Sequence, residues 1–521
     1  MMRRIRHQDA VAPWPGRDRR AVRHPGPAGA PCVPEDRTVT VVGGGIAGMA
    51  AATVLAERGV HVNLLEGGDR LGGRVAAWPV DRERTMGRGF HAFFRQYYNL
   101  RALLRRADPG LTRLRPIADY PLQRPDGLRD SFARIPRTPP FSVLGFVLRS
   151  PSFTAGSLAR VNVPAALELV RVRFPESFAH YDGESASAFL DRLRFPSKAR
   201  DLALEVFARS FFAHPDDFSA GELVAMFHAY FVGSAEGLLF DVPDDDFDTA
   251  LWSPLHRHLD DLGVDVRTDS TVISLGPGGV RLVDGTQIAG DAVVLATDPT
   301  SARTLVDGLD RTPGIEAWRR RVRATRTAPP FVVVRLWLDG LVAPQRPAFL
   351  GTSGYGPLDN VSVLERFEAG AARWSAEHGG SVVELHAYAC SDAVADSPGT
   401  TADAGALDAL VTELETQLHR VQPETAGLTV LHREVRVGRD CPLVDTSPWR
   451  ERPGVSTPLP WLVLAGDWVR CDHPVALMER AATTGILAAN ELLQSWGAAG
   501  EDVWTVPTRG LLARRGAPGS A

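Results

Sequence analysis

Lysine, cysteine and long apolar runs are scarce in this chain, and each scarcity excludes a class of protein. Lys198 is the single lysine among 58 lysine and arginine residues, so arginine carries nearly all of the positive charge. The four cysteines show no CxxC or metal-ligand spacing, which predicts free thiols in a reducing cytoplasm and no metal site. No stretch reaches the roughly 18 consecutive apolar residues of a membrane-spanning helix. We therefore expect a cytoplasmic chain that does not cross a membrane.

Charge and hydropathy are those of an ordinary globular protein. The net charge is −4 and the isoelectric point is near 6.4, which gives no reason to expect a nucleic-acid partner. A length of 521 residues is enough for two or three domains, and 44% of the residues are hydrophobic. Residues 1–37, rich in Arg, Pro and Gly, predict a disordered tail or, alternatively, a basic arm on anionic lipid. Residues 496–521 predict a flexible C-terminal tail.

Residues 38–66 contain the pattern of strand, glycine turn, helix, strand and acid with which α/β folds bind dinucleotides. Gly43 allows the tight turn, Gly45 lets the backbone approach a pyrophosphate, and Gly48 lets the helix pack on the strand. Glu66 ends the second strand about 20 residues later, where an acid binds the ribose hydroxyls. The pattern predicts a Rossmann-like domain whose helix N-terminus faces the phosphates.

The segment that follows separates a flavin protein from a nicotinamide dehydrogenase. The run Gly-Gly-Asp-Arg-Leu-Gly-Gly-Arg at residues 67–74 resembles the extended signature of the FAD-dependent amine oxidase and phytoene desaturase superfamily. The resemblance implies that Gly72, Gly73 and Arg74 lie along the FAD diphosphate, where Arg74 supplies charge and forked donors. A nicotinamide dehydrogenase has no need of this segment.

Two later segments also resemble FAD motifs of this superfamily. Residues 291–297 resemble the strand that returns beside the cofactor, and residues 461–467 resemble the last FAD motif, with Asp467 at the ribityl or pyrophosphate region. A helix is predicted from Pro474 to about Leu493, and in relatives its N-terminus points at the flavin pyrimidine. The resemblance therefore implies FAD as the cofactor, with four further contacts at Gly89, Val272, Gly466 and Met478.

The resemblance also implies how the chain is divided. We expect an α/β fold: a discontinuous Rossmann-like FAD-binding domain with an inserted mixed α+β substrate domain and a helical roof. The predicted FAD-binding segments are residues 38–95, 251–327 and 446–495. Residues 96–250 are expected to form the helical, membrane-facing insertion, and residues 328–445 an antiparallel sheet that floors the substrate cavity.

Two runs carry a narrower resemblance. Met86–Leu100, with its Arg-Gly-Phe-His-Ala-Phe-Phe core, and Gly466–Pro474 look like runs of the actinobacterial isorenieratene synthases, the β-carotene desaturase/methyltransferases. This resemblance covers about residues 39–493. It implies a reaction that converts the β-ionone rings of β-carotene into trimethyl-aryl rings, with loss of hydrogen to flavin and a 1,2-methyl shift. The implied partners are a hydrophobic carotenoid and, through Phe141–Leu148, a membrane surface.

Hydride removal from such a ring leaves a carbocation, and a base must then take a proton. His91 is the first candidate, because relatives bring this part of the chain beside the isoalloxazine; His473 and Glu479 are next. A hydrogen bond from His91 to backbone or flavin stays an open alternative. Aromatic faces stabilise a cation by about 0.5–2 kcal/mol per contact. Suitable side chains in the same run are Phe90, Phe93, Phe94, Tyr97 and Tyr98.

Other functions of the same fold stay open. A phytoene-type desaturase, a carotenoid isomerase or a hydroxysqualene-type dehydroxylase would use the apolar cavity for a linear polyene. An amine oxidase is disfavoured, because that branch places a lysine near flavin N5 and Lys198 is remote in sequence from every flavin motif. A non-enzymatic prenyl-binding escort of the Rab GDP-dissociation-inhibitor type would have this fold without a working flavin.

Overall fold

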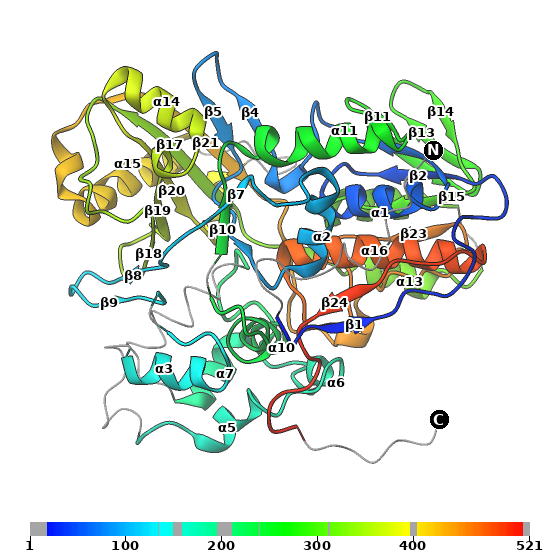
Figure 1. Cartoon of the computed structure of the whole chain (residues 1–521), viewed down its shortest axis with the longest axis horizontal. Helices are drawn as coiled ribbons and strands as arrows, with labels where there is room; N and C mark the ends of the chain where they lie inside the picture. Colours follow the sequence, from blue (N-terminus) through cyan, green and yellow to red (C-terminus); the bar gives the residue numbers. More distant parts are fainter. Residues whose placement is uncertain are drawn as a thin grey trace.

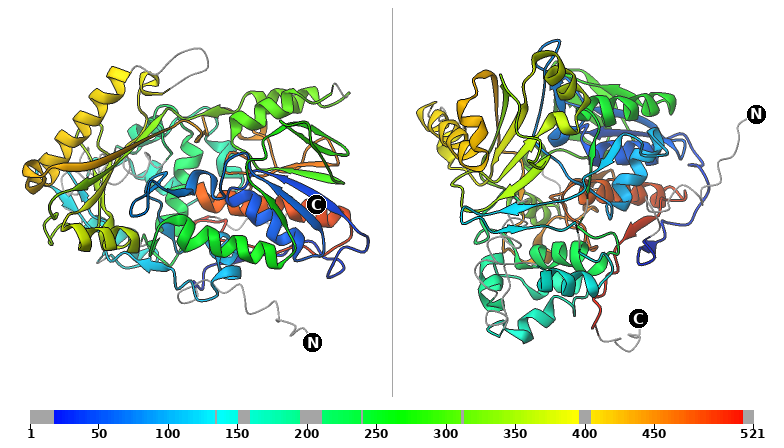
Figure 2. Two further views of the ribbon diagram at one scale, coloured as in Figure 1. Left: turned by 90° about the horizontal axis from the view of Figure 1, so that it is seen from above. Right: turned by 60° about the vertical axis from the view of Figure 1, so that its left-hand side comes forward.

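Two large β-sheets and a group of helices form most of the molecule, and smaller sheets lie among them (Figure 1). The computed structural model describes residues 18–133, 135–149, 159–194, 211–238, 240–310, 313–395 and 404–513. A parallel sheet with its blue and red helices lies at one end of the molecule (Figure 2). A larger sheet, green to gold in the same views, lies at the other end.

The parallel sheet has five strands in the order β11-β3-β2-β15-β23. They come from separate parts of the chain: β2 (Thr38–Val42), β3 (His61–Leu65), β11 (Asp265–Arg267), β15 (Ala292–Leu295) and β23 (Leu462–Leu464). The central strands are rich in valine and leucine because other elements cover both faces of the sheet. The predicted discontinuous, Rossmann-like α/β fold is confirmed.

Helices α1 (Ile46–Ala56) and α16 (Leu477–Ser495) cover one face of this sheet and pack on each other. Their approach is close, because a Cβ atom on Gly485 would lie 2.3 Å from the carbonyl oxygen of Ala47. Elements on the other face are β12 (Val272–Gly276), β13 (Gly279–Leu282), β14 (Gln287–Ala289), α12 (Pro299–Asp307) and α13 (Glu316–Arg323). Since α1 follows β2 and α16 follows β23, both helices begin at the carboxyl edge of the sheet, where α/β folds bind ligands.

The larger sheet has seven strands in the order β21-β17-β20-β19-β18-β8-β9. Only β18 and β8 run parallel. The strands are β8 (Leu122–Gln123), β9 (Arg129–Asp130), β17 (Phe331–Leu338), β18 (Phe349–Thr352), β19 (Asn360–Val363), β20 (Val382–Ala387) and β21 (Val430–Gly438). Residues 328–445 thus form most of this sheet, and residues 96–250 add two strands at its edge.

Two helices accompany this sheet, α14 (Ala369–His378) and α15 (Ala404–Val421). Helix α15 covers the outer face, where Leu414 and Leu418 are buried against Val332 and Leu385. Alternation along a strand sends every second residue to the opposite face. The inner face of β17 and β20 therefore carries a different set of side chains, which includes charged and polar groups and faces the rest of the molecule.

Residues 96–261 supply most of the remaining helices. They are α2 (Tyr98–Ala107), α3 (Phe141–Arg149), α5 (Val163–Glu168), α6 (Glu176–His180), α7 (Ala186–Leu193), α10 (Ala220–Phe227), α11 (Ser253–Asp261) and two π-helices, His228–Gly233 and Asp248–Trp252. A three-stranded sheet lies among them, made of β6 (Phe93–Phe94), β10 (Phe240–Pro243) and β7 (Leu114–Pro116). Within the described ranges, none of the helices combines the length and the apolar character needed to cross a membrane.

Short elements complete the fold. Two-stranded pairs join β4 (Ala77–Pro79) with β5 (Thr85–Gly87), and β16 (Arg326–Thr327) with β22 (Pro442–Leu443). The 3₁₀-helices are Gly73–Val75, Leu364–Arg366, Asp392–Val394, Pro423–Gly427 and Trp449–Glu451. The domain boundaries that we predict stay a prediction.

The described parts of the two tails, residues 18–37 and 496–513, pack on the rest of the molecule, which corrects the prediction of disorder and flexibility for these residues. Strand β1 (Val22–His24) pairs antiparallel with β24 (Val503–Thr505). The carboxylate of Asp18 accepts hydrogen bonds from the hydroxyls of Tyr98 and Ser234. The composition of each tail alone predicts an unstructured chain, because the hydrogen-bond partners of one tail lie in the other.

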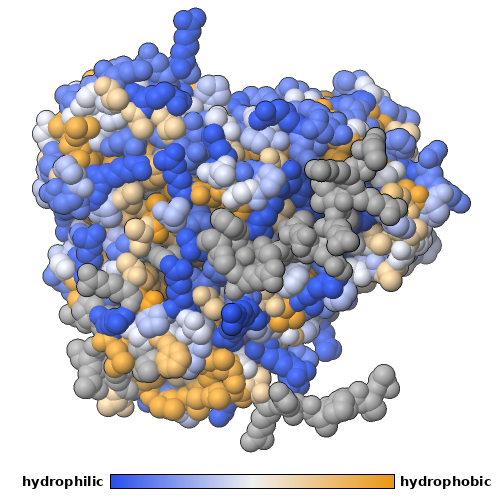
Figure 3. Space-filling model, viewed as in Figure 1, coloured by the Kyte–Doolittle hydropathy of each residue, from blue (hydrophilic) through white to orange (hydrophobic). Residues whose placement is uncertain are grey.

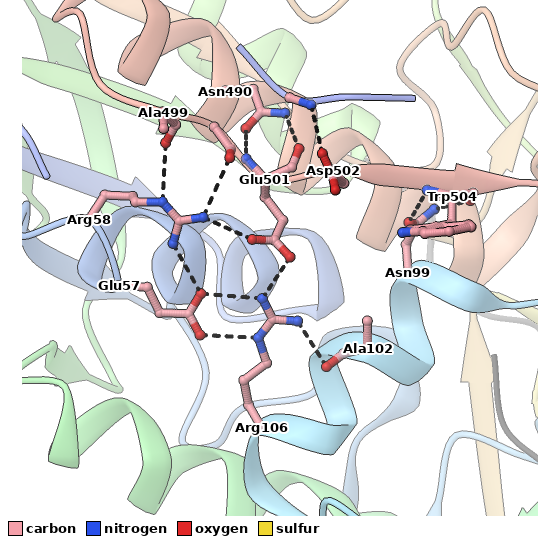
Figure 4. Close-up of polar contacts among 12 residues, drawn as sticks. Glu57, Arg58, Asn99, Ala102, Arg106, Asn490, Ala499, Glu501, Asp502 and Trp504 are labelled. Carbon is pink, nitrogen blue, oxygen red and sulfur yellow. Dashed lines mark hydrogen bonds and ion pairs between the residues drawn. The ribbon is translucent and has the colours of Figure 1, made fainter. Parts of the chain in front are cut away.

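A buried ion-pair network fastens the C-terminal segment to the body (Figure 4). Glu501 accepts hydrogen bonds of 3.0 Å from both Arg58 and Arg106, and Arg106 also bonds Glu57. The amide of Asn490 exchanges hydrogen bonds of 2.7 and 2.8 Å with the backbone of Glu501. Glu57 and Arg58 directly follow α1, Arg106 lies in α2 and Asn490 in α16, so the segment ties the ends of three helices together.

Candidate active site

A cavity of about 730 Å³ is lined by residues of both large sheets and of the helical insertion. Most of the predicted cofactor residues lie on its wall: Gly43, Gly45, Glu66, Gly72, Gly73, Arg74, Val272, Gly466, Asp467 and Met478. Gly48 and Gly89 are not among its lining residues in the described part of the chain. The volume lies within the range of about 300–1,000 Å³ that is usual for ligand pockets.

The glycine turn leaves open space where the pattern predicts a pyrophosphate. Gly43 has φ +111°, and a Cβ there would lie 2.6 Å from the carbonyl oxygen of Ala296. A Cβ on Gly45 would meet only the Cα of Gly73, at 4.0 Å, so this position faces the cavity. A Cβ on Gly48 would lie 1.9 Å from the carbonyl oxygen of Gly43, so this glycine is needed for helix packing.

The N-terminus of α1 can bind an anion. Its N-cap residue, Gly45, has no side chain, and no capping hydrogen bond satisfies the first backbone N–H groups. Glu66 lies beside this turn, and its carboxylate accepts hydrogen bonds from the N–H of Gly44 at 2.7 Å and of Gly68 at 2.8 Å. These bonds hold the acid at the cavity wall, where a ribose would follow the phosphates.

Arg74 and Asp467, predicted from segments far apart in sequence, form an ion pair at the cavity wall. One guanidinium nitrogen of Arg74 lies 2.7 Å from Oδ2 of Asp467, and a second nitrogen binds Oδ1. Burial alone would lower the pKa of Arg74, but the charge and the hydrogen bonds of Asp467, with smaller contributions from Cys441 and Asp440, together outweigh burial and raise that pKa. The arginine therefore stays charged beside the phosphate end of the cavity.

The other end of the cavity is an aromatic chamber. Its walls are made by Phe90, Phe94, Tyr97, Tyr120, Phe212, Met226, Tyr230, Phe240, Phe331, Phe349 and Tyr388. Among the predicted aromatics, Phe93 and Tyr98 lie elsewhere: Phe93 is fully buried and the Tyr98 hydroxyl binds Asp18. The hydroxyls of Tyr97 and Tyr230 lie 2.6 Å apart and satisfy each other, so these tyrosines present mainly ring surface.

The N-terminus of α16 lies on the cavity wall, between the glycine-lined end and the aromatic chamber. Leu477, Met478 and Ala481 line the cavity, and the N-cap residue Ala476 provides no side-chain hydrogen bond to the first turn. The helix begins at Leu477, slightly later than the predicted Pro474. Its exposed N–H groups and dipole favour negative charge at this point.

His91 lies on the cavity wall, and one hydrogen bond defines the tautomer of its ring. The carbonyl oxygen of Gly89 lies 2.8 Å from Nδ1, so Nδ1 donates a proton to it. Burial lowers the pKa of His91 to about 4, so the ring is neutral at pH 7 and keeps its lone pair on Nε2. Both predicted roles, base and hydrogen-bonding group, remain compatible with this geometry.

His473 and Glu479 are not among the residues that line the cavity in the described ranges. The ring of His473 lies against His24, with centroids 4.3 Å apart, and burial lowers its pKa to about 4. Glu479 caps the start of α2, because it accepts hydrogen bonds of 2.8–3.0 Å from the backbone and side chain of Asn99 and the backbone of Leu100. The geometry therefore favours structural roles for both residues.

A polar cluster on the inner face of the larger sheet escaped the sequence analysis. Tyr388 and Asn360 line the chamber, and Glu384 and His386 lie behind them. The signal that could have revealed it is an alternation in Val-Val-Glu-Leu-His-Ala-Tyr, residues 382–388, where the polar side chains recur at every second position. Such a pattern on a strand buried on both faces is unusual, because buried charges need partners.

Comparisons with known proteins agree on the family. A model of the flavin containing amine oxidoreductases matches residues 46–493. A carotenoid phi-ring synthase of Streptomyces griseus is 54% identical over 504 residues, which are 95% of each chain. Another, from Chlorobaculum tepidum, is 25% identical and covers 92% of this chain and 91% of its own.

A solved structure of putrescine oxidase shares the fold. It has a TM-score of 0.62 and 14% identity, and the match covers 88% of this chain and 99% of the other. The open glycine turn, the uncapped N-termini of α1 and α16, and the acid beside the turn fit a flavin dinucleotide. This chain belongs to the flavin containing amine oxidoreductase family and is an FAD-dependent oxidoreductase.

Proposed function

We propose that this protein modifies carotenoids and converts β-ionone rings of β-carotene into trimethyl-aryl rings, with an intramolecular 1,2-methyl shift. The observation that carries the proposal is the aromatic chamber that continues directly from the glycine-lined end of the cavity. The relative that is 54% identical is named a carotenoid phi-ring synthase, and its name describes formation of a carotenoid ring. An apolar chamber beside a cofactor site suits a substrate that has no polar handle.

The cofactor assignment by residue is part of this proposal. Gly43 and Gly45 admit the pyrophosphate to the N-terminus of α1, and Glu66 binds the ribose of the adenosine. Arg74 and Asp467 bind the diphosphate and ribityl region. The first turn of α16, with Met478, would hold the isoalloxazine end, and Gly72, Gly73, Val272 and Gly466 would supply further contacts.

The reaction balances as two rounds of oxidation for each ring. A β-ionone ring has one ring double bond and an aryl ring has three, so four hydrogens leave as two hydrides and two protons. When bound, FAD would supply the hydride acceptor in each round, and an external acceptor of the quinone class would then take up the electrons. The methyl group moves with its electron pair to the neighbouring cationic carbon and stays in the product.

The chamber's own residues protect and stabilise the cation. Phe90, Phe94 and Tyr97 present ring faces, each worth about 0.5–2 kcal/mol when it contacts a cation. Phe90 packs against Phe349 and Phe240, with centroids 4.2 and 5.6 Å apart, so these rings are held in place. A wall of packed aromatic rings also excludes water, which would otherwise add to the cation.

His91 can accept one of the protons. Its Nε2 lone pair is available, because Nδ1 donates to Gly89 and the ring is neutral. Charging the ring in this buried position is unfavourable, so it would hold the proton only briefly before release.

A membrane contact completes the proposal. Phe141 and Leu148, at the two ends of α3, expose 61% and 73% of their surface, and Val163 at the start of α5 exposes 60%. Hydrophobic side chains gather at the lower edge of the view in Figure 3, over these helices. An exposed apolar patch on a helical layer is typical of proteins that take lipid-soluble substrates from a bilayer surface.

The deciding experiment is expression in a host that makes β-carotene, followed by extraction of the pigment. We expect a carotenoid with one or two aryl ends and no label from an isotopically labelled methyl donor. Unchanged β-rings together with desaturation of linear carotenes would instead support the phytoene-desaturase alternative. An amine oxidase is disfavoured, because that branch places a lysine near flavin N5 and Lys198, the single lysine of the sequence, is remote in sequence from every flavin motif.

A further inference from the structure

A line of three polar side chains runs from the centre of the larger sheet to the aromatic chamber. Glu384, His386 and Tyr388 alternate along β20 and its end, so they share the inner face of the sheet. Glu384 and His386 are each 1% exposed, whereas Tyr388 reaches the cavity. The ring of Tyr388 is held by Phe212, with centroids 4.9 Å apart.

Hydrogen bonds connect the three side chains in sequence. Nδ1 of His386 lies 2.7 Å from the hydroxyl of Tyr388, and Nε2 lies 2.8 Å from Oε1 of Glu384. The side-chain amide of Asn360, on the neighbouring strand β19, donates to the same hydroxyl at 3.0 Å. The hydroxyl is thus oriented by two side chains and keeps a second lone pair.

The direction of these bonds follows from the charge of Glu384. Burial alone would raise the pKa of Glu384, but the charge of Arg335 is the largest of the opposing causes, and the pKa is lowered to about 2. Arg335 holds the other carboxylate oxygen at 2.7 Å. Glu384 is therefore ionised and can only accept, so Nε2 of His386 must donate to it.

One neighbour competes for Nε2. The backbone N–H of Phe90 lies 3.1 Å from this nitrogen and would require a lone pair on it. The carboxylate is both nearer and charged, and charge-assisted hydrogen bonds are about twice as strong as neutral ones. In the neutral ring the proton is therefore on Nε2 and the lone pair on Nδ1, so the Tyr388 hydroxyl donates to Nδ1.

We propose that Tyr388 is a catalytic residue that takes a ring proton from the substrate and passes its own proton to His386, with Glu384 as the counter-charge. The inference rests on the proposed function. In this step a ring C–H bond breaks and its electron pair forms a ring double bond. The proton binds the Tyr388 oxygen while the Tyr388 proton moves to Nδ1 of His386.

Tyr388, His386 and Glu384 form a proton relay. The relay supplies a proton acceptor that a lone tyrosine could not supply. Burial and the charge of Asp359 raise the pKa of Tyr388 well above its usual value, so a free tyrosinate does not form. The relay avoids one, because the tyrosine exchanges protons and the charge settles on the pair of His386 and Glu384. Each ring loses two protons, so Tyr388 and His91 can each serve one.

The relay also contacts the run Met86–Leu100, through Gly89. Gly89 has φ +97°, and a Cβ there would lie 2.7 Å from Cε1 of His386. The run Gly89–Phe90–His91 therefore lies directly over the relay. This packing explains the glycine before Phe90, since a side chain would push His386 away from Glu384.

Tyr388→Phe tests the proposal, with Tyr355→Phe as the matched control. Tyr355 is also buried and also uses its hydroxyl, which accepts from Gln123 at 2.9 Å and donates to the carbonyl of Arg124. It lies outside the cavity wall in the described residues. With β-carotene and a quinone acceptor, we expect Tyr388→Phe to form aryl product about 10²–10⁴-fold more slowly, as for loss of a general base. FAD content and carotene binding, followed by absorbance, should stay as in the control.

Two further readouts separate a relay from a structural role. Selective ¹⁵N labelling of histidine should show His386 protonated on Nε2 and not on Nδ1, with its signal identified by loss in His386→Gln. Glu384→Gln should weaken this tautomer preference and slow turnover while KM changes little. A proton on Nδ1 in the wild type would overturn the relay even if Tyr388→Phe fails to fold.

The outcomes distinguish the two proposals. If the wild type leaves β-rings unchanged, the proposed function fails and the relay with it. If the wild type forms aryl rings and Tyr388→Phe does so at the rate of Tyr355→Phe, the relay alone is wrong.

Discussion

Replacing Gly45 by valine should remove FAD from a protein that is otherwise folded. The position has φ −79° and ψ −176°, an extended conformation that any residue adopts, and a Cβ there would meet only the Cα of Gly73 at 4.0 Å. The new side chain therefore enters the cavity and not the core. We expect the free energy of unfolding of the apoprotein to fall by only about 1 kcal/mol, because valine is a poorer N-cap residue than glycine but touches no packed atoms.

The effect of FAD on stability gives the magnitude. A ligand present at 100 times its dissociation constant stabilises the folded state by about 2.7 kcal/mol. The wild type should gain this stabilisation with FAD, and Gly45→Val should gain close to none. Chemical denaturation with and without FAD measures the difference, and the flavin absorbance of the purified protein provides a second check.

Two glycine variants serve as controls. Gly278→Val adds the same side chain where no atom lies within 4 Å, and it should keep full flavin content. Gly48→Val would place its Cβ 1.9 Å from the carbonyl oxygen of Gly43 and should impair folding itself. If Gly45→Val purifies with full flavin, the pyrophosphate does not lie at this turn and our cofactor site is wrong.

Four further outcomes are expected. His91→Ala should slow turnover by about 10²–10⁴-fold and leave FAD bound; unchanged activity would remove His91 from the mechanism. The protein should sediment with membranes and need detergent for full release. Replacing the exposed Phe141 and Leu148 by serine should release it from the membranes without detergent. A wild-type protein that is fully soluble in a low-salt lysate would contradict this prediction. Burial lowers the pKa of His228 to about 4, so between pH 6.5 and pH 4 the unfolded chain binds more protons than the folded protein does. The free energy of unfolding should therefore fall on acidification through this range, by up to about 1.4 kcal/mol per pH unit for this residue. This pH dependence should be smaller in His228→Gln. Deleting residues 1–37 should lower the unfolding midpoint, because β24 loses its partner strand; an unchanged midpoint would show that this pairing contributes nothing.

The sequence predicted the cofactor end of the molecule better than the chamber end. The glycine turn, Glu66 and the runs that contain Arg74 and Asp467 are local motifs, in which neighbouring residues carry the function. Gly43, Gly45, Glu66, Arg74 and Asp467 all line the same cavity, whereas Gly48 serves the packing of α1. Local motifs are readable because the strand, turn and helix that they need lie within a few residues of each other.

The relay could not be read in the same way, because sheet pairing assembles it. Arg335 lies opposite Glu384 across β17 and β20, and Asn360 lies opposite His386 across β19 and β20. These pairs are 26 to 49 residues apart in sequence, and no spacing rule connects them. The tails escaped prediction for a similar reason: β1 and β24 each look like unstructured chain until the two are paired.

The distance of Glu384 from the chamber is itself consistent with chemistry on a cation. A carboxylate in direct contact with a carbocation would add to it and form an ester, which would block the site. Glu384 instead lies behind His386 and Tyr388, and Arg335 neutralises it at 2.7 Å. Its charge can stabilise a proton that moves inward, because a buried charge interacts strongly with its neighbours. The oxygen that meets the substrate then belongs to a neutral phenol, which is a weak nucleophile, so the arrangement supplies basicity while it keeps the stronger nucleophile away from the ring.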